Sequence, residues 1–324
     1  MSPDSLPEPL HPHAPDPLAA APKKQGSDLP TRLLTAAILV PLVGYVIVLG
    51  GLIYLGVVIV FVLLGQREFY RLIEEKGGHA FVSFGMAAGA ALPVVAYIGN
   101  EYHATLILNA TLLAVMVRSV GRAEIAQALG NISGTFFGVF YIGWLLSHIV
   151  VLRNFHDVAV AKYGAADVDA LGIMPEAGIF YTFFCMTAVV FSDAGAYFAG
   201  RAWGRRKLAP RISPGKTVEG AIGGVVAGTV GALALKLLFD TFWPDLSGAM
   251  SYGLGALMAV VVAIFAIIGD LVESLLKRDA QTKDTGSLLP GMGGILDRID
   301  SPLLGVPVMY YMLLLSTYLR MGAS

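Results

Sequence analysis

Charged residues are scarce in this sequence. They make up 14% of its 324 residues, whereas 56% are hydrophobic. An average soluble domain has about 25% charged residues. The scarcity excludes an ordinary soluble enzyme and predicts an all-α polytopic membrane protein. The formal net charge of −1 argues against a nucleic-acid partner.

Cysteine is nearly absent as well. The single cysteine, Cys185, excludes an internal disulfide and is expected to be a small residue of an apolar core.

Residues 1–31 are rich in Pro, Asp and His and lack the apolar side chains that a core needs, so they predict a disordered tail. We expect no cleaved signal peptide, because the first apolar run starts late and a second follows at once.

Long apolar runs supply the fold. A span needs about 20 mostly apolar residues to cross about 30 Å of hydrocarbon. Such runs predict about nine transmembrane helices, five in an N-terminal membrane region, residues 32–176, and four in a C-terminal catalytic region, residues 177–324. The runs are residues 33–50, 51–64, 81–98, 105–117, 130–152, 179–199, 221–238, 250–268 and 303–319.

Lysine and arginine are distributed unevenly among the predicted loops. They precede the first span and follow the second, fourth and sixth spans, which is one side of the membrane if there are nine spans. Cationic loops stay in the cytoplasm. We therefore expect the N-terminus in the cytoplasm, the C-terminus outside, and an active site on the cytoplasmic side of a bacterial inner membrane.

One predicted loop with its flanks, residues 269–301, is packed with charge between two apolar runs. Charge is costly at a membrane, so this density needs a functional reason. Five polar residues recur at i, i+3, i+4, i+7 and i+8, which puts them on one face of a helix. They are Asp270, Glu273, Ser274, Lys277 and Arg278.

A loop rich in Gly and Pro, residues 286–294, follows this stripe and leads to a second charged group, Asp297-Arg298-Ile299-Asp300. Glycines let the backbone turn tightly and approach a ligand closely. Carboxylates hold Mg²⁺, which prefers oxygen ligands, and nearby cations offset phosphate charge. The alternative is a solvated loop whose charges pair with each other; the one-sided stripe and the glycines favour a metal-dependent phosphoryl site.

A second polar cluster follows the sixth span. Asp193 lies inside an apolar run, where a lone acid is a candidate functional residue unless a partner helix satisfies it. Residues 213–217 (SPGKT) form a short turn before a helix, whose free N–H groups suit a phosphate. Gly220, Gly224 and Gly228 then predict close helix packing within or between subunits, compatible with a homodimer.

Together these clusters resemble the phosphatidate cytidylyltransferase family, also called CDP-diacylglycerol synthases. The family pattern S-x-x-K-R-x4-K-D-x-G-x2-L-P-G-H-G-G-x-x-D-R-x-D is similar to residues 274–300, and two shorter pieces match residues 192–200 and 213–220. Met292 stands where the family usually has His, and Val218 where it tends to have Trp. We expect Met292 only to shape the loop, because the surrounding metal and phosphate groups are intact.

The resemblance implies an integral-membrane nucleotidyltransferase that converts CTP and phosphatidate to CDP-diacylglycerol and pyrophosphate in phospholipid biosynthesis. It implies Mg²⁺ held by Asp270 and Asp297, with a second cation left open. The remaining residues expected in catalysis are Lys277, Arg278, Lys283, Asp284, Arg298 and Asp300. The residues expected to bind substrate are Asp193, Ser213, Lys216, Thr217, Ser274, Gly293 and Gly294.

Two alternatives stay open from the sequence. A transporter would spread charged residues through several spans near the midplane, whereas here they cluster at one edge. A related lipid enzyme acting on ether lipids would share the same motifs, and the residues do not reveal which nucleotide base is used.

Overall fold

The computed structural model describes residues 29–99, 101–121, 125, 127–282, 284–286 and 293–322. Most of the predicted tail lies outside this part of the chain, as do Lys283 and Met292. The first helix begins at Leu29, so the predicted tail boundary at residue 31 falls within its first turn.

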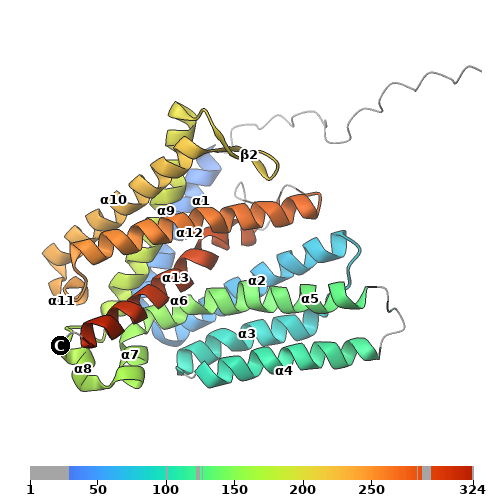
Figure 1. Ribbon diagram of the computed structural model, residues 1–324, viewed down its shortest axis with the longest axis horizontal. Coiled ribbons are helices and arrows are strands. Elements are labelled where there is room, and N and C mark those ends of the chain that lie inside the picture. The colour runs from blue at the N-terminus through green and yellow to red at the C-terminus, as the bar shows by residue number, and fades with distance from the viewer. Residues whose placement is uncertain are drawn as a thin grey trace, which may run out of the picture.

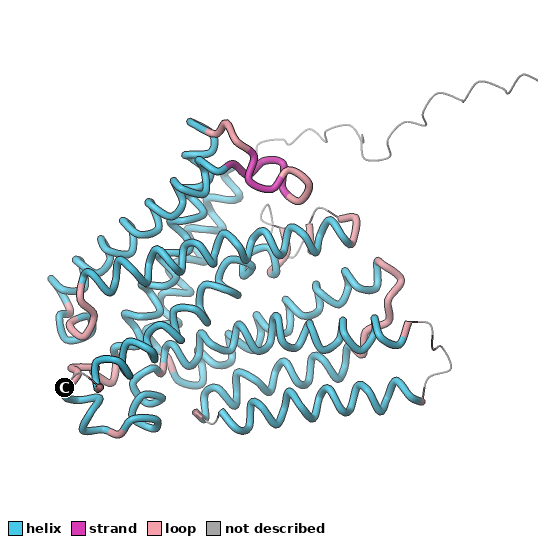
Figure 2. Tube along the Cα trace, in the orientation of Figure 1, coloured by secondary structure: helices cyan, strands magenta, loops and turns pink. Residues whose placement is uncertain are grey.

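Helices make up nearly all of the described structure (Figure 2). The first nine elements are α1 (Leu29–Leu49), α2 (Gly51–Glu75), α3 (Val82–Ile98), α4 (Glu101–Val120), α5 (Ala128–Gly138), η1 (Val139–Trp144), α6 (Leu145–Arg153), α7 (Phe155–Tyr163) and α8 (Ala165–Ala170). The rest are α9 (Ala177–Trp203), β1 (Lys207–Ala209), β2 (Ser213–Thr217), α10 (Val218–Phe242), α11 (Pro244–Ser247), α12 (Tyr252–Asp279) and α13 (Leu296–Met321).

Seven helices in the described part of the chain are long and apolar enough to cross a membrane. The segment from α5 to α6 counts as one of them, with the π-helical turn η1 inside it. Two shorter apolar helices, Ala37–Leu49 and Val82–Ile98, accompany them. An all-α polytopic membrane protein is confirmed, and each predicted run overlaps one of these helical segments over most of its length.

Cys185 is fully buried and unpaired, as its apolar surroundings predicted. It belongs to a core cluster that α9 shares with α12 and α13. The only strands among the described residues, β1 and β2, form an antiparallel hairpin between α9 and α10.

The glycines of α10 pack against α9 of the same chain. A Cβ on Gly224 would lie 2.8 Å from the Ser192 carbonyl oxygen, and one on Gly228 would lie 2.6 Å from the Ala188 carbonyl oxygen. Glycine therefore allows these two backbones to approach closely. This face is used within the chain, so the homodimer stays a prediction that these glycines do not support.

One end of the molecule collects the ends of several helices (Figure 1). There α2, α9 and α12 end, and α10 and α13 begin. An ion pair between Lys76 and Asp279 joins the ends of α2 and α12. The short helices α7, α8 and α11 lie at the opposite end with the C-terminus. The charged stretch predicted from the sequence therefore lies at the end that also carries the hairpin.

Candidate active site

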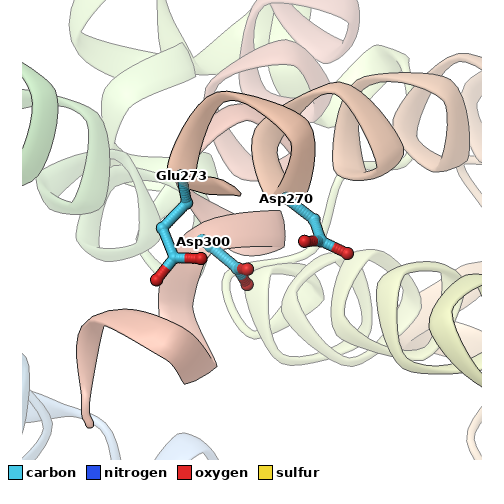
Figure 3. Close-up of side chains that lie close together, drawn as sticks. All are labelled: Asp270, Glu273 and Asp300. Atoms are coloured by element: carbon cyan, nitrogen blue, oxygen red, sulfur yellow. The ribbon is translucent and has the colours of Figure 1, made fainter. Parts of the chain in front are cut away.

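Three carboxylates meet where α12 and α13 cross. Asp270 and Glu273 come from α12 and Asp300 from the second turn of α13, and the close-up shows them converging (Figure 3). One oxygen of each lies within 4.8 Å of the others. Glu273 is fully buried, Asp300 is 8% exposed, and Asp270 is partly exposed.

Local structure explains the convergence. Asp270 and Glu273 are three residues apart, so they share one face of α12. Gly269 precedes them and allows α13 to approach, because a Cβ there would clash with the Asp300 carbonyl oxygen. The third acid therefore reaches the first two through a close contact of helix backbones.

Two lysines accompany these acids. Lys216 Nζ, at the end of β2, lies 2.7 Å from Asp270 Oδ2. Lys277 Nζ lies 2.5 Å from Glu273 Oε2 and 2.9 Å from Asp297 Oδ1. The contacts of Lys216 with Asp270 and of Lys277 with Glu273 are ion pairs at short distance, not well-aligned hydrogen bonds. Three acids thus share two lysines, and Asp300 has no ion pair with a lysine among the described residues.

The group fits a divalent cation. Neither carboxylate oxygen of buried Glu273 accepts an aligned hydrogen bond from any residue that the structure describes. Its counter-charge, Lys277, is shared with Asp297, so the buried negative charge is only partly compensated. Three clustered carboxylates outnumber the lysines bound to them, and carboxylate oxygens are the ligands that Mg²⁺ prefers.

Asp297 lies beside this group and is not one of the three converging acids. It pairs with Lys277, and its Oδ2 accepts a hydrogen bond from the Gly294 N–H at 2.8 Å. Lys277 links it to Glu273, so the two ends of the charged stretch do meet. The metal pair Asp270–Asp297 stays a prediction, and the described residues offer the set of Asp270, Glu273 and Asp300 beside it.

The other predicted catalytic residues spread outward from the acids. Arg278 is exposed and donates through Nε to the Ile212 carbonyl at 3.2 Å, which ties α12 to the hairpin. Arg298 and Asp284 are exposed at the same end, and Lys283 lies outside the described residues. Among the described residues, Arg278, Arg298 and Asp284 are therefore exposed, in contrast to buried Glu273 and Asp300.

The predicted substrate-binding residues divide between the site and the framework. Lys216 reaches Asp270, and Ser274 Oγ lies 3.4 Å from Asp270 Oδ1. Asp193 is exposed and accepts a hydrogen bond from Ser301 Oγ at 3.3 Å, next to Asp300. Ser213 begins β2 and is partly exposed.

Three other predicted ligand contacts have protein partners. Thr217 caps α10, because its Oγ1 accepts from the Gly220 N–H at 3.1 Å. Gly293 has a φ of 86°, and a Cβ there would lie 2.8 Å from Asp297 Oδ2. A Cβ on Gly294 would lie 2.5 Å from Glu68 Oε2. These glycines make room for protein carboxylates, and their contact with substrate stays a prediction.

A buried tyrosine hydroxyl lies in the core beside the first turns of α13. Tyr141 lies in η1, is 3% exposed, and its hydroxyl has no hydrogen-bond partner among the described residues. Tyr141 belongs to the same core cluster as Leu296 and Ile299 of α13. π-Helical turns are frequent at functional sites. The sequence carries no periodic signal for such a turn, and Tyr141 was not predicted.

Two acids of this region were missed as functional residues. Glu273 belonged to the predicted stripe but received no role. Its position three residues after Asp270 already put the two carboxylates on one face of a helix. Glu68 lies on α2, more than 200 positions from the loop that it contacts, and nothing in the local pattern marks it.

Comparison with known proteins gives a consistent result. The model of the cytidylyltransferase family matches residues 30–316. The chain is 32% identical over 303 residues to phosphatidate cytidylyltransferase from Synechocystis, covering 89% of this chain and 97% of that protein. It is 33% identical over 278 residues to phosphatidate cytidylyltransferase from Bacillus subtilis, covering 83% and 95%. The Haemophilus influenzae protein of the same name is 42% identical over 138 residues, covering 42% of this chain and 46% of that protein.

Proposed function

The chain belongs to the cytidylyltransferase family, and from this we propose that it converts CTP and phosphatidate to CDP-diacylglycerol and pyrophosphate in phospholipid synthesis. A phosphate oxygen of phosphatidate attacks the α-phosphorus of CTP. The new P–O bond forms as the bond from the α-phosphorus to the bridging oxygen breaks, and pyrophosphate leaves with that oxygen. A phosphate monoester is largely ionised at neutral pH, so the attacking group needs little general-base help.

The main support for this proposal is the cluster of acids where α12 and α13 cross. Its three carboxylates outnumber the two lysines that bind them. Asp270, Glu273 and Asp300 would hold Mg²⁺, and Asp297 is the further acid that the sequence offers. The bound ion supplies charge neutralisation on the phosphates of CTP. A second cation remains compatible with the number of carboxylates.

The cations of the site would bind and orient the phosphates. Lys277 and Lys216 lie against the acids, so a triphosphate anchored there comes within reach of both ammonium groups. Exposed Arg278 and Arg298 extend the positive charge toward solvent. With little covalent chemistry for the protein to perform, these side chains contribute mainly by positioning and by charge.

We infer the membrane orientation from the charges at this same end of the molecule. Arg205 and Arg206 lead into the hairpin, which begins at Lys207 and lies at the end where α2 and α12 finish. Cationic segments favour the cytoplasmic side. Nine spans with a cytoplasmic N-terminus and an outer C-terminus would place the site on the cytoplasmic side of a bacterial inner membrane, where CTP is dissolved.

The acyl chains of phosphatidate require an apolar path beside the site. A cavity of about 820 Å³ lies between α2, α5 and α12. Phe69, Phe136 and Phe140 line it, and Leu276 brings it to α12 one turn after Glu273. A second cavity of about 960 Å³ meets α13 between Tyr310 and Tyr318, so its nearest point on that helix lies almost three turns beyond Asp300. The first cavity is therefore our candidate for the acyl path.

The test is conversion of labelled CTP by the purified protein in liposomes that contain phosphatidate. We expect CDP-diacylglycerol and pyrophosphate in equal amounts, loss of turnover with a chelator, and recovery with Mg²⁺. A panel of nucleotides and a comparison of ester with ether phosphatidates define the substrate. Solute flux into the liposomes without CTP turnover would instead support a transporter.

A further inference from the structure

Glu68 connects the N-terminal helices to the acidic site. Its side chain extends from α2 and accepts three hydrogen bonds from the segment that leads into α13. Ile295 N–H donates to Oε1 at 3.0 Å, Leu296 N–H donates to Oε2 at 2.8 Å, and Thr285 Oγ1 donates to Oε2 at 3.2 Å. All three partners lie more than 200 positions away in the sequence.

These bonds cap α13 from another helix. The first N–H groups of a helix lack partners within it, and a carboxylate there is favoured by the helix dipole. The residue at the N-cap position, Ile295, has no side chain that could cap the helix. The carboxylate of Glu68 takes this role in its place, with two charge-assisted hydrogen bonds.

The glycines around Glu68 leave space for its carboxylate, because they have no side chain that would clash with it. A Cβ on Gly286 would lie 2.5 Å from Glu68 Oε1, and one on Gly294 would lie 2.5 Å from Oε2. On the side of α2, a Cβ on Gly65 would lie 3.0 Å from Ile299 Cδ1. Three glycines thus allow α2 and its acid to approach the first turns of α13.

The position of α13 determines where its acid Asp300 lies. Asp300 joins Asp270 and Glu273 only if α13 begins at the right height and rotation against α12. Resting on the function proposed above, we propose that Glu68 is a positioning residue, which fixes the start of α13 and thereby sets Asp300 in the metal-binding group. It acts through the helix and does not contact the phosphates.

Glu68→Gln tests this, with Glu74→Gln as the matched control. Gln has the size of Glu but turns an N–H₂ group toward at least one of the backbone donors. Glu74 is an exposed acid on the same helix. We expect Glu68→Gln to speed hydrogen–deuterium exchange at the Ile295 and Leu296 amides at least tenfold. It should also lower kcat at least tenfold and raise the Mg²⁺ concentration for half-maximal activity severalfold, whereas Glu74→Gln changes none of these.

Unchanged exchange at the two amides would overturn the proposal, whatever the activity. A lower melting temperature with wild-type kcat and Mg²⁺ dependence would also overturn it, because that is the signature of a purely structural contact. If Glu68→Gln does not fold, Thr285→Val removes only the third hydrogen bond. A smaller change in the same three quantities then supports the proposal, and no change overturns it. If the wild type shows no CTP turnover, the proposed function fails, while the exchange measurement still decides the role of Glu68.

Discussion

Both ends of this membrane protein bury charge, but they compensate it differently. At the end with the C-terminus, Lys236 is 3% exposed and donates to both oxygens of Asp240, at 2.8 and 3.0 Å. Its ammonium also lies 4.7 Å from the centre of the Tyr252 ring. This lysine has one acid and an aromatic face, and the local charge is balanced.

Arg153 at the same end is balanced too. It donates to the Ile47 carbonyl at 2.7 Å and to the Val48 carbonyl at 3.3 Å, so it caps the C-terminus of α1. Glu176 lies 3.1 Å away. Gly50, with a φ of 63°, forms the turn between α1 and α2, and a Cβ there would lie 2.9 Å from Arg153 Nη2.

The acidic site lacks such a balance. Lys277 is shared by Glu273 and Asp297, and Asp300 has only the N–H of the next residue as a hydrogen-bond donor among its described contacts. Where each buried cation has its own partners, the charge holds helices together. Where clustered acids outnumber the lysines bound to them, we propose that a cation from solution completes the site. The comparison therefore separates structural from functional charge.

The largest expected effect is at the converging acids. Asp300→Asn should lower kcat/KM at least a thousandfold, a loss of about 4 kcal/mol, because it removes a carboxylate from the proposed metal-binding group. Radiolabelled CTP turnover and titration of Mn²⁺ binding by electron paramagnetic resonance measure this, with Asp245→Asn, at an exposed acid on α11, as the control. Comparison with Asp297→Asn decides which acids form the metal set, and wild-type metal binding in Asp300→Asn would remove that residue from it.

The second largest effect is expected for the ion pair of Lys236 with Asp240, at the end with the C-terminus. Asp240→Asn should lower the free energy of unfolding by about 3 kcal/mol, because it leaves buried Lys236 without its counter-charge. The folded fraction should keep its specific activity. Unfolding in mixed detergent micelles measures the stability, and the double variant Lys236→Met, Asp240→Asn should recover most of the loss. A loss of activity in folded Asp240→Asn would break the distinction between the two ends.

A subtler change sharpens the comparison at the site. Lys277→Arg keeps the charge but replaces a single nitrogen, 2.5 and 2.9 Å from two acids, with a planar fork. We expect about a tenfold decrease in kcat, or about 1.4 kcal/mol, with little change in stability. Steady-state kinetics checks this, and equal activity of the two cations would mean that Lys277 supplies charge without a required geometry.

The smallest effect is expected for an exposed pair. Arg71 Nε lies 3.1 Å from Glu75 Oε1 on α2, with both side chains well exposed. Arg71→Ala should change the free energy of unfolding by less than about 0.5 kcal/mol, because water screens such pairs. Thermal unfolding in detergent measures it. A change of several kcal/mol would show that charge at this end is structural as well.

The sequence alone determined the membrane helices and one half of the site. Each apolar run became a helix because a chain in hydrocarbon must satisfy its backbone hydrogen bonds internally. Asp270, Glu273 and Lys277 share a face because helical spacing puts them there. These properties are local and can be read from neighbouring residues.

Only the tertiary structure decided how the other half of the site is assembled. Asp300 meets Asp270 and Glu273, Asp297 takes Lys277 as its partner, and Glu68 caps α13 from a helix far away in the sequence. Such pairings depend on the height and rotation at which packed helices cross, which the spacing along one helix does not encode. They are set by glycine contacts between backbones and by hydrogen bonds to helix ends, and these exist only once the helices have come together.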